Sequence, residues 1–144
     1  GIPLTHRDDA TSTLFITGHQ CRTAKGQDWE TLAKLNSTLV FYMGMRRLSE
    51  IVLGLLENGK SKETPIAIIQ NATLQSQKIL ASDLSSILKD VKEYKTLTPA
   101  IIIIGKVVNS YDEIQKYLDV IPADIVHPIE DIGFDIWKNQ AIIV

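Results

Sequence analysis

The chain has 144 residues, of which 44% are hydrophobic and 22% are charged, a composition typical of a globular protein with one ordinary domain. Lys and Arg number 15 against 17 Asp and Glu, so the formal net charge is −2. Because there is no basic excess, nucleic acid is not expected as the main partner.

The longest apolar run, residues 99–105, is far too short to cross a bilayer, so no membrane partner is expected. Cys21 is the single cysteine and cannot form an internal disulfide, which predicts a reducing, cytoplasmic location. No neighbour would activate its thiol, which favours a small apolar residue over a nucleophile. The chain opens with Gly1 and has no initiator Met and no secretion signal. We therefore interpret it as a piece of a longer protein.

The first half of the chain alternates between strand and helix patterns. A β-branched and aromatic run predicts a strand over 12–19, and Asp28 can cap a short helix that follows it. Residues 38–43 predict a second strand. The apolar spacing from Leu48 to Leu56 then predicts an amphipathic helix, which Asn58 and Gly59 would end.

The pattern continues with a strand over 64–70 and a shorter one over 77–81. Ser82 and Asp83 are predicted to start a helix, and 99–108 is apolar on both faces, as in a covered central strand. Strands alternating with helices in this way predict an α/β protein built as a three-layer sandwich.

The last third of the chain has a weaker pattern. Residues 110–118 are compatible with a helix whose inner side carries Tyr111, Ile114 and Leu118. Beyond it, short apolar runs mix with Pro128 and Gly133. We expect one domain over 1–108 and an unassigned C-terminal extension over 109–144.

Most familiar catalytic patterns are missing. The sequence contains no glycine-rich phosphate loop, no dinucleotide fingerprint and no nucleophile elbow. His6, His19 and His127 are far apart and lack cysteine partners, so no metal site is expected. The adjacent acids Asp8–Asp9 and Glu130–Asp131 are interpreted as solvated loop residues.

Two strand ends have unusual chemistry, at the place where α/β sheets commonly bind ligands. Met43 and Gly44 join a polarizable side chain to a residue that lets another group approach the backbone. Asn71, Ala72 and Thr73 follow a buried strand and would leave backbone groups open to a flat ligand. On these residues alone, a core methionine and two ordinary turns remain the simpler interpretation.

Four stretches together resemble the tetrapyrrole methylase family, and among them the uroporphyrinogen-III C-methyltransferases. They are "GIPLTHR", "DWETLAKLNSTLVFYMG", "NATLQSQ" and "TPAIIIIGKVV", and they occur in the family's order. The resemblance extends from Gly1 to about Val108. It implies the C-terminal domain of the tetrapyrrole methylase fold, an α/β sandwich with a mixed sheet.

The resemblance also implies a function. The enzyme would use S-adenosylmethionine to methylate C2 and C7 of uroporphyrinogen III, giving precorrin-2 for siroheme or cobalamin, and would be a cytoplasmic homodimer. It places Met43 and Ala72 in the cofactor pocket, flanked by Asn71 and Thr73. It places Arg7 near the tetrapyrrole, where a guanidinium can pair with a propionate carboxylate. No catalytic residue is assigned.

The family's N-terminal half, with its Gly-rich loop, does not match any part of this sequence, so we expect the chain alone to be inactive. Three alternatives remain open. The chain belongs to another precorrin methyltransferase, to a non-catalytic dimerisation domain, or to a flavodoxin-like binding module.

Overall fold

The computed structural model describes residues 1–18, 26–94 and 98–118. Its strands are β1 (Thr13–Thr17), β2 (Thr38–Tyr42), β3 (Pro65–Gln70), β4 (Lys78–Asp83) and β5 (Ala100–Ile104). Its helices are α1 (Trp29–Lys34), α2 (Leu48–Glu57), α3 (Ile87–Tyr94) and α4 (Ser110–Leu118), with short 3-10 turns η1 (Met45–Arg47) and η2 (Lys106–Asn109). The predictions for His19, Cys21, His127, Pro128, Gly133 and the acid pair Glu130–Asp131 lie outside the described residues.

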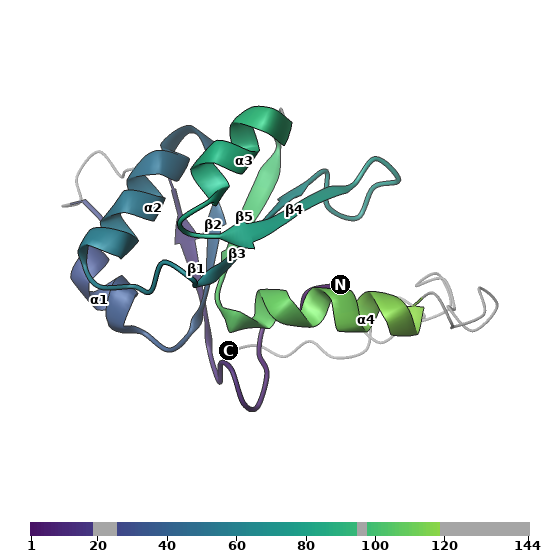
Figure 1. The fold of residues 1–144 in the computed structure, drawn as a ribbon, viewed down its shortest axis with the longest axis horizontal. Helices are drawn as coiled ribbons and strands as arrows, with labels where there is room; N and C mark the ends of the chain where they lie inside the picture. Colours follow the sequence, from purple (N-terminus) through teal and green to yellow (C-terminus); the bar gives the residue numbers. More distant parts are fainter. Residues whose placement is uncertain (19–25, 95–97, 119–144) are drawn as a thin grey trace, which may run out of the picture.

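The five strands form one mixed sheet in the order β1-β2-β5-β3-β4 (Figure 1). Strands β1 and β2 are parallel, while β5 is antiparallel to both β2 and β3. Consequently β2 and β3 run in the same direction, and their carboxyl ends reach the same edge of the sheet. The first residues of β5 lie between those two ends.

Strand β5 confirms the prediction of a central strand covered on both faces. Ile102 pairs with Phe41 on β2 and with Ile68 on β3, and these side chains are buried in the cluster on one face. The next residue, Ile103, is buried in the cluster on the other face. The strand is shorter than predicted. Gly105 has a φ of +146°, which favours glycine, and turns the chain into η2 before residue 108.

One face of the sheet is covered by α1, α2 and α3 (Figure 1). The stripe predicted for α2 is confirmed, because Leu48, Ile51, Val52 and Leu55 are buried in the main core cluster. The start of α1 and the end of α2 have local causes. Asp28 caps α1 by accepting a 3.0 Å hydrogen bond from the Thr31 N–H, as predicted. The Asn58–Gly59 pair ends α2, with Gly59 at a φ of +93°.

The other face carries a smaller cluster. Val40, Ala67 and Ile103 of the sheet pack there with Val107 and Val108 of η2. Within the described ranges this covering is short, so the three-layer arrangement stays a prediction. Helix α4 confirms the expected helix over 110–118.

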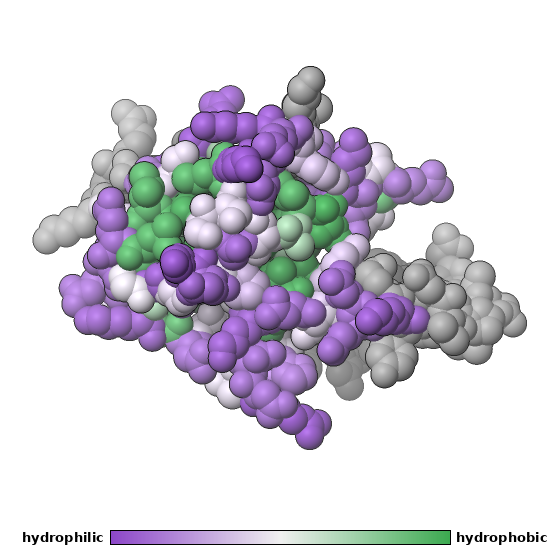
Figure 2. All heavy atoms as spheres, in the orientation of Figure 1, coloured by the Kyte–Doolittle hydropathy of each residue, from purple (hydrophilic) through white to green (hydrophobic). Residues whose placement is uncertain are grey.

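Figure 2 shows, in the view of Figure 1, hydrophobic residues gathered in the upper half and hydrophilic residues around the rim and lower half. Among the described residues no helix has the length and apolar content needed to span a membrane.

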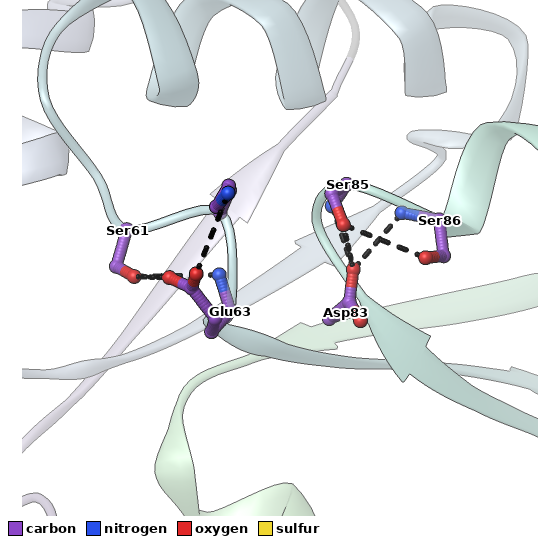
Figure 3. Close-up of polar contacts among 6 residues, drawn as sticks. Ser61, Glu63, Asp83, Ser85 and Ser86 are labelled. Atoms are coloured by element: carbon purple, nitrogen blue, oxygen red, sulfur yellow. Dashed lines mark hydrogen bonds and ion pairs between the residues drawn. The ribbon is translucent and has the colours of Figure 1, made fainter.

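The start of α3 differs from its prediction. Ser82 and Asp83 belong to β4, where Asp83 pairs with Pro65, and the helix begins only at Ile87. Asp83 instead holds the turn before the helix. Its Oδ1 accepts hydrogen bonds of 2.8 and 2.9 Å from the backbone N–H groups of Ser85 and Ser86. Figure 3 shows this carboxylate directed at both serines, with the Ser61–Glu63 contact in the neighbouring loop.

Replacing Asp83 with alanine is expected to lower the free energy of unfolding at pH 7 by about 1 kcal/mol, because two backbone donors lose their acceptor. The hydrogen bond from the Ser85 side chain is the main cause that lowers the pKa of the Asp83 carboxyl. Its stabilisation is therefore present above the ordinary carboxyl pKa and is lost as pH falls through the lower, folded-state pKa. Urea unfolding measured from pH 7 to pH 3 should show the free energies of unfolding of the variant and the wild type converging. An unchanged gap at pH 3 would contradict this assignment, and Glu93→Gln is a control that removes an exposed acid.

Candidate functional site

Two strained turns lie at the same edge of the sheet, at the carboxyl ends of β2 and β3. Met43 has a φ of +53°, Asn71 of +49° and Thr73 of +71°. In the described part of the chain, no other non-glycine residue has a positive φ. Asparagine tolerates this conformation, but for methionine and threonine it costs about 1–2 kcal/mol. Strain of this kind is concentrated at functional sites, so these turns are the first place to look for one.

The turn after β2 is held by close backbone packing. Gly18, at the end of β1, donates a 2.7 Å hydrogen bond to the Tyr42 carbonyl. A Cβ on Gly18 would lie only 2.5 Å from the Gly44 Cα. The Arg47 Nη1 donates a 2.9 Å hydrogen bond to the Gly18 carbonyl from the other side. The backbone at Met43 is thus positioned by its neighbours on both β1 and η1.

Gly44 has a different role from the one its sequence context suggested. A Cβ at this position would lie 2.8 Å from the Ile102 Cδ1 and 3.0 Å from the Ile51 Cδ1. The group that approaches the Gly44 backbone is therefore the protein core. Core packing explains why residue 44 is glycine without invoking a ligand.

The turn after β3 is closed by its own polar groups. The Asn71 N–H donates to the Pro99 carbonyl at 3.2 Å, and the Asn71 side-chain amide lies 3.2 Å from the Ser76 hydroxyl. The Thr73 N–H donates to the Gln77 Oε1 at 2.8 Å. Ala72, which has only a small side chain, lies between these two hydrogen-bonded residues and lines a cavity.

A cavity of about 600 Å³ lies between the two turns. Its lining residues are Tyr42, Met43, Met45, Arg46, Ile69, Asn71, Ala72, Leu74, Thr98, Pro99, Ala100 and Ile101.

The cavity brings together three of the predicted site residues, Met43, Asn71 and Ala72, from strands that are not neighbours in the sheet. Thr73 belongs to the same turn but is not part of the lining. Arg7 is exposed and lies elsewhere, in a turn closed by the 3.0 Å hydrogen bond from the Ala10 N–H to the His6 carbonyl. The roles of these residues stay predictions.

Other lining residues were not predicted from the sequence. Met45 and Arg46 come from η1, and Thr98 and Pro99 precede β5. For Thr98 and Pro99 the signal that could have found them is the direction of β5. Because β5 is antiparallel to β2 and β3, its start lies at the edge of the sheet where those two strands end.

The chemistry of this wall suits a flat, largely apolar ligand. The side chains of Met43, Met45 and Leu74 offer apolar contact, while Asn71 offers an amide. Among the described residues that line the cavity, Arg46 is the single charged one. Among the described residues that line the cavity there is no His, Cys, Asp or Glu, so this part of the lining can bind and orient a ligand but supplies no carboxylate or imidazole base. Among the described residues no group of three or more possible metal ligands occurs.

A second, smaller cavity of about 120 Å³ lies near Lys60. The Lys60 Nζ donates a 2.9 Å hydrogen bond to the Leu35 carbonyl, and burial lowers the pKa of this lysine. Because Lys60 thereby connects the loop after α2 to the loop after α1, its interaction stabilises the fold.

Several known proteins are similar to this chain. A siroheme synthase of Pseudoalteromonas translucida (strain TAC 125) is 39% identical over 117 residues, which are 81% of this chain and 25% of that protein. An S-adenosyl-L-methionine-dependent uroporphyrinogen III methyltransferase of Methanosarcina barkeri (strain Fusaro / DSM 804) is 40% identical over 114 residues, 78% of this chain and 45% of that protein. The chain thus spans from a quarter to less than half of these relatives.

Among solved structures, the uroporphyrin-III C-methyl transferase from Thermus thermophilus complexed with S-adenyl homocysteine is similar, with a TM-score of 0.64 and 26% identity. The match covers 75% of this chain and 48% of that one, which confirms the predicted fold. Residues 1–88, more than half of the chain, match the family model for tetrapyrrole (corrin/porphyrin) methylases. The chain belongs to the tetrapyrrole methylase family.

Proposed function

We propose that this chain forms one wall of the cofactor site in an S-adenosylmethionine-dependent uroporphyrinogen-III C-methyltransferase, as its C-terminal domain. The observation that carries the proposal is the shared cavity of Met43 and the Asn71–Ala72 turn. Relatives named for this reaction, and a similar structure named as a complex with S-adenyl homocysteine, support the choice of cofactor.

The proposed chemistry needs little from this wall beyond binding. A ring carbon of uroporphyrinogen III takes the methyl group from the sulfonium, at C2 and then at C7. In each transfer the electrons of the broken C–S bond return to sulfur, so one S-adenosylmethionine becomes one S-adenosylhomocysteine. Two transfers consume two S-adenosylmethionines and give precorrin-2 with the release of a proton, for which the described lining offers no carboxylate or imidazole acceptor. Positioning two ligands and excluding water accounts for most of what the site must do. A largely apolar wall whose described residues include no carboxylate or imidazole is compatible with that task.

The cavity is open in a way that suggests a second wall. Met43 and Leu74 line it and are 64% and 61% exposed, unusually high values for large apolar side chains. We propose that the rest of the protein, the half that this chain does not match, covers them. A cytoplasmic homodimer is the assembly that the family resemblance predicts.

Calorimetric titration of S-adenosylhomocysteine into the full-length gene product and into residues 1–144 tests the proposal. Binding to the full-length protein alone is expected, because the cavity is one wall. Comparable binding to residues 1–144 would mean that the two turns form a sufficient pocket. Absence of binding to either would overturn the proposal and favour the non-catalytic alternative.

Arg7 is proposed to pair with a carboxylate of the tetrapyrrole, outside the cavity. Arg7→Ala in the full-length protein is then expected to raise the KM for uroporphyrinogen III about tenfold, with the Kd of S-adenosylhomocysteine unchanged. Steady-state kinetics combined with the titration separate the two effects. Weaker cofactor binding at constant KM would remove Arg7 from the substrate site.

A further inference from the structure

The 3-10 turn η1 contains two adjacent arginines in very different situations. The Arg47 guanidinium donates to both carboxylate oxygens of Glu50 and to the Gly18 carbonyl. It is only 20% exposed in its side chain, so it is a structural residue. Arg46 is exposed, lines the cavity, and has no hydrogen bond or ion pair with any described residue.

The surroundings of Arg46 do not neutralise its charge. The described residues of the cavity lining include no Asp or Glu, and the nearest acid along the chain, Glu50, is already paired with Arg47. A lone cation beside an apolar wall attracts an anion more strongly than the same cation on an open polar surface, since fewer water dipoles screen it. The guanidinium presents its donors as a planar fork, a geometry that matches a carboxylate.

We propose that Arg46 binds a carboxylate of the ligand that occupies this cavity and thereby helps to determine ligand specificity. This inference rests on the proposed function, because both ligands of that reaction carry carboxylates. S-adenosylmethionine has a carboxylate at its amino-acid end, and uroporphyrinogen III has carboxylates on its acidic side chains. The chemistry recognised is the same in either case, and the experiment distinguishes the two sources.

The test uses Arg46→Gln and Arg46→Lys in the full-length gene product. Lys89→Gln is the matched control, because Lys89 is an exposed cation on α3 and does not line the cavity. Three quantities are measured: the Kd of S-adenosylhomocysteine, the Kd of 5′-methylthioadenosine, which lacks the carboxylate, and the KM for uroporphyrinogen III. Circular dichroism melting checks that each variant is folded.

If the carboxylate belongs to the cofactor, Arg46→Gln raises the Kd of S-adenosylhomocysteine about tenfold or more and leaves the Kd of 5′-methylthioadenosine unchanged. If it belongs to the tetrapyrrole, the KM rises by a similar factor while both Kd values stay constant. In both cases Arg46→Lys recovers part of the loss, since lysine keeps the charge without the fork.

Two outcomes overturn the inference while the proposed function stands. In one, Arg46→Gln changes neither the Kd of S-adenosylhomocysteine nor the KM. In the other, the Kd values of S-adenosylhomocysteine and 5′-methylthioadenosine rise by the same factor, which would assign Arg46 a packing role. Failure of the wild-type protein to bind S-adenosylhomocysteine is a different result, and it overturns the proposed function together with the inference.

Discussion

Met43→Asp is expected to weaken S-adenosylhomocysteine binding by the full-length gene product about a hundredfold or more while leaving the fold intact. The variant would put an unpaired carboxylate into the largely apolar lining of the cavity, and burying such a charge under a bound ligand costs several kcal/mol. Stability should be nearly unchanged, because Met43 is 64% exposed and aspartate tolerates its φ of +53° better than methionine does. Calorimetry measures the affinity, and urea unfolding measures the stability.

Two matched variants separate charge from shape. Met43→Asn keeps the size of aspartate without its charge and is expected to lose less affinity. Met43→Leu keeps an apolar side chain and should bind close to normally, apart from the strain of a positive φ. Equal affinity in Met43→Asp and wild type would remove residue 43 from the cofactor site.

Gly18→Ala is expected to lower the free energy of unfolding by about 2–3 kcal/mol and to weaken cofactor binding as well. The added Cβ would meet the Gly44 Cα at 2.5 Å and the Gly44 N at 2.9 Å. These are backbone atoms and cannot turn aside as a side chain can, so β1 and the Met43 turn must move apart. Thermal unfolding and the S-adenosylhomocysteine Kd report the two effects.

Gly59→Ala is a useful reference for this result. Gly59 has a φ of +93° but no atom within 4 Å of its would-be Cβ, so alanine there should cost only the conformational penalty of about 1–2 kcal/mol. At Gly18 the penalty is steric instead. Where space is available and the backbone conformation is one that alanine adopts without strain, replacing glycine with alanine stabilises a chain by restricting its unfolded state. A stabilised Gly18→Ala variant would therefore show that the predicted contact with Gly44 is absent.

The sequence predicted the elements well where the local signal and the tertiary contacts agree. The strands around Phe41 and Ile102, the capping of α1 by Asp28 and the end of α2 at Asn58 were all visible in residue type and spacing. It was wrong at the start of α3. There Asp83 extends β4 by pairing with Pro65 of the preceding strand β3, a contact that residue type and local spacing do not reveal.

Part of the candidate site was also predictable. Strand ends marked Met43 and Ala72 because their chemistry is unusual for such positions. The contribution of Pro99 could not be predicted, because it requires knowing that β5 lies between β2 and β3 and runs in the opposite direction. Nor does the sequence distinguish Arg46 from Arg47, whose ion pairing depends on where Gly18 and Glu50 lie in space.

The strand order has a consequence for how the site is assembled. The turns at Met43 and Asn71 belong to strands separated by β5, which is made of residues synthesised about thirty positions after the second turn. A nascent chain therefore contains both turns that line the cavity before it contains the strand that sets the distance between them. Once the Pro99 carbonyl accepts the Asn71 N–H, the spacing is defined. The cavity is thus among the last features to form, although eight of its twelve described lining residues come before residue 75.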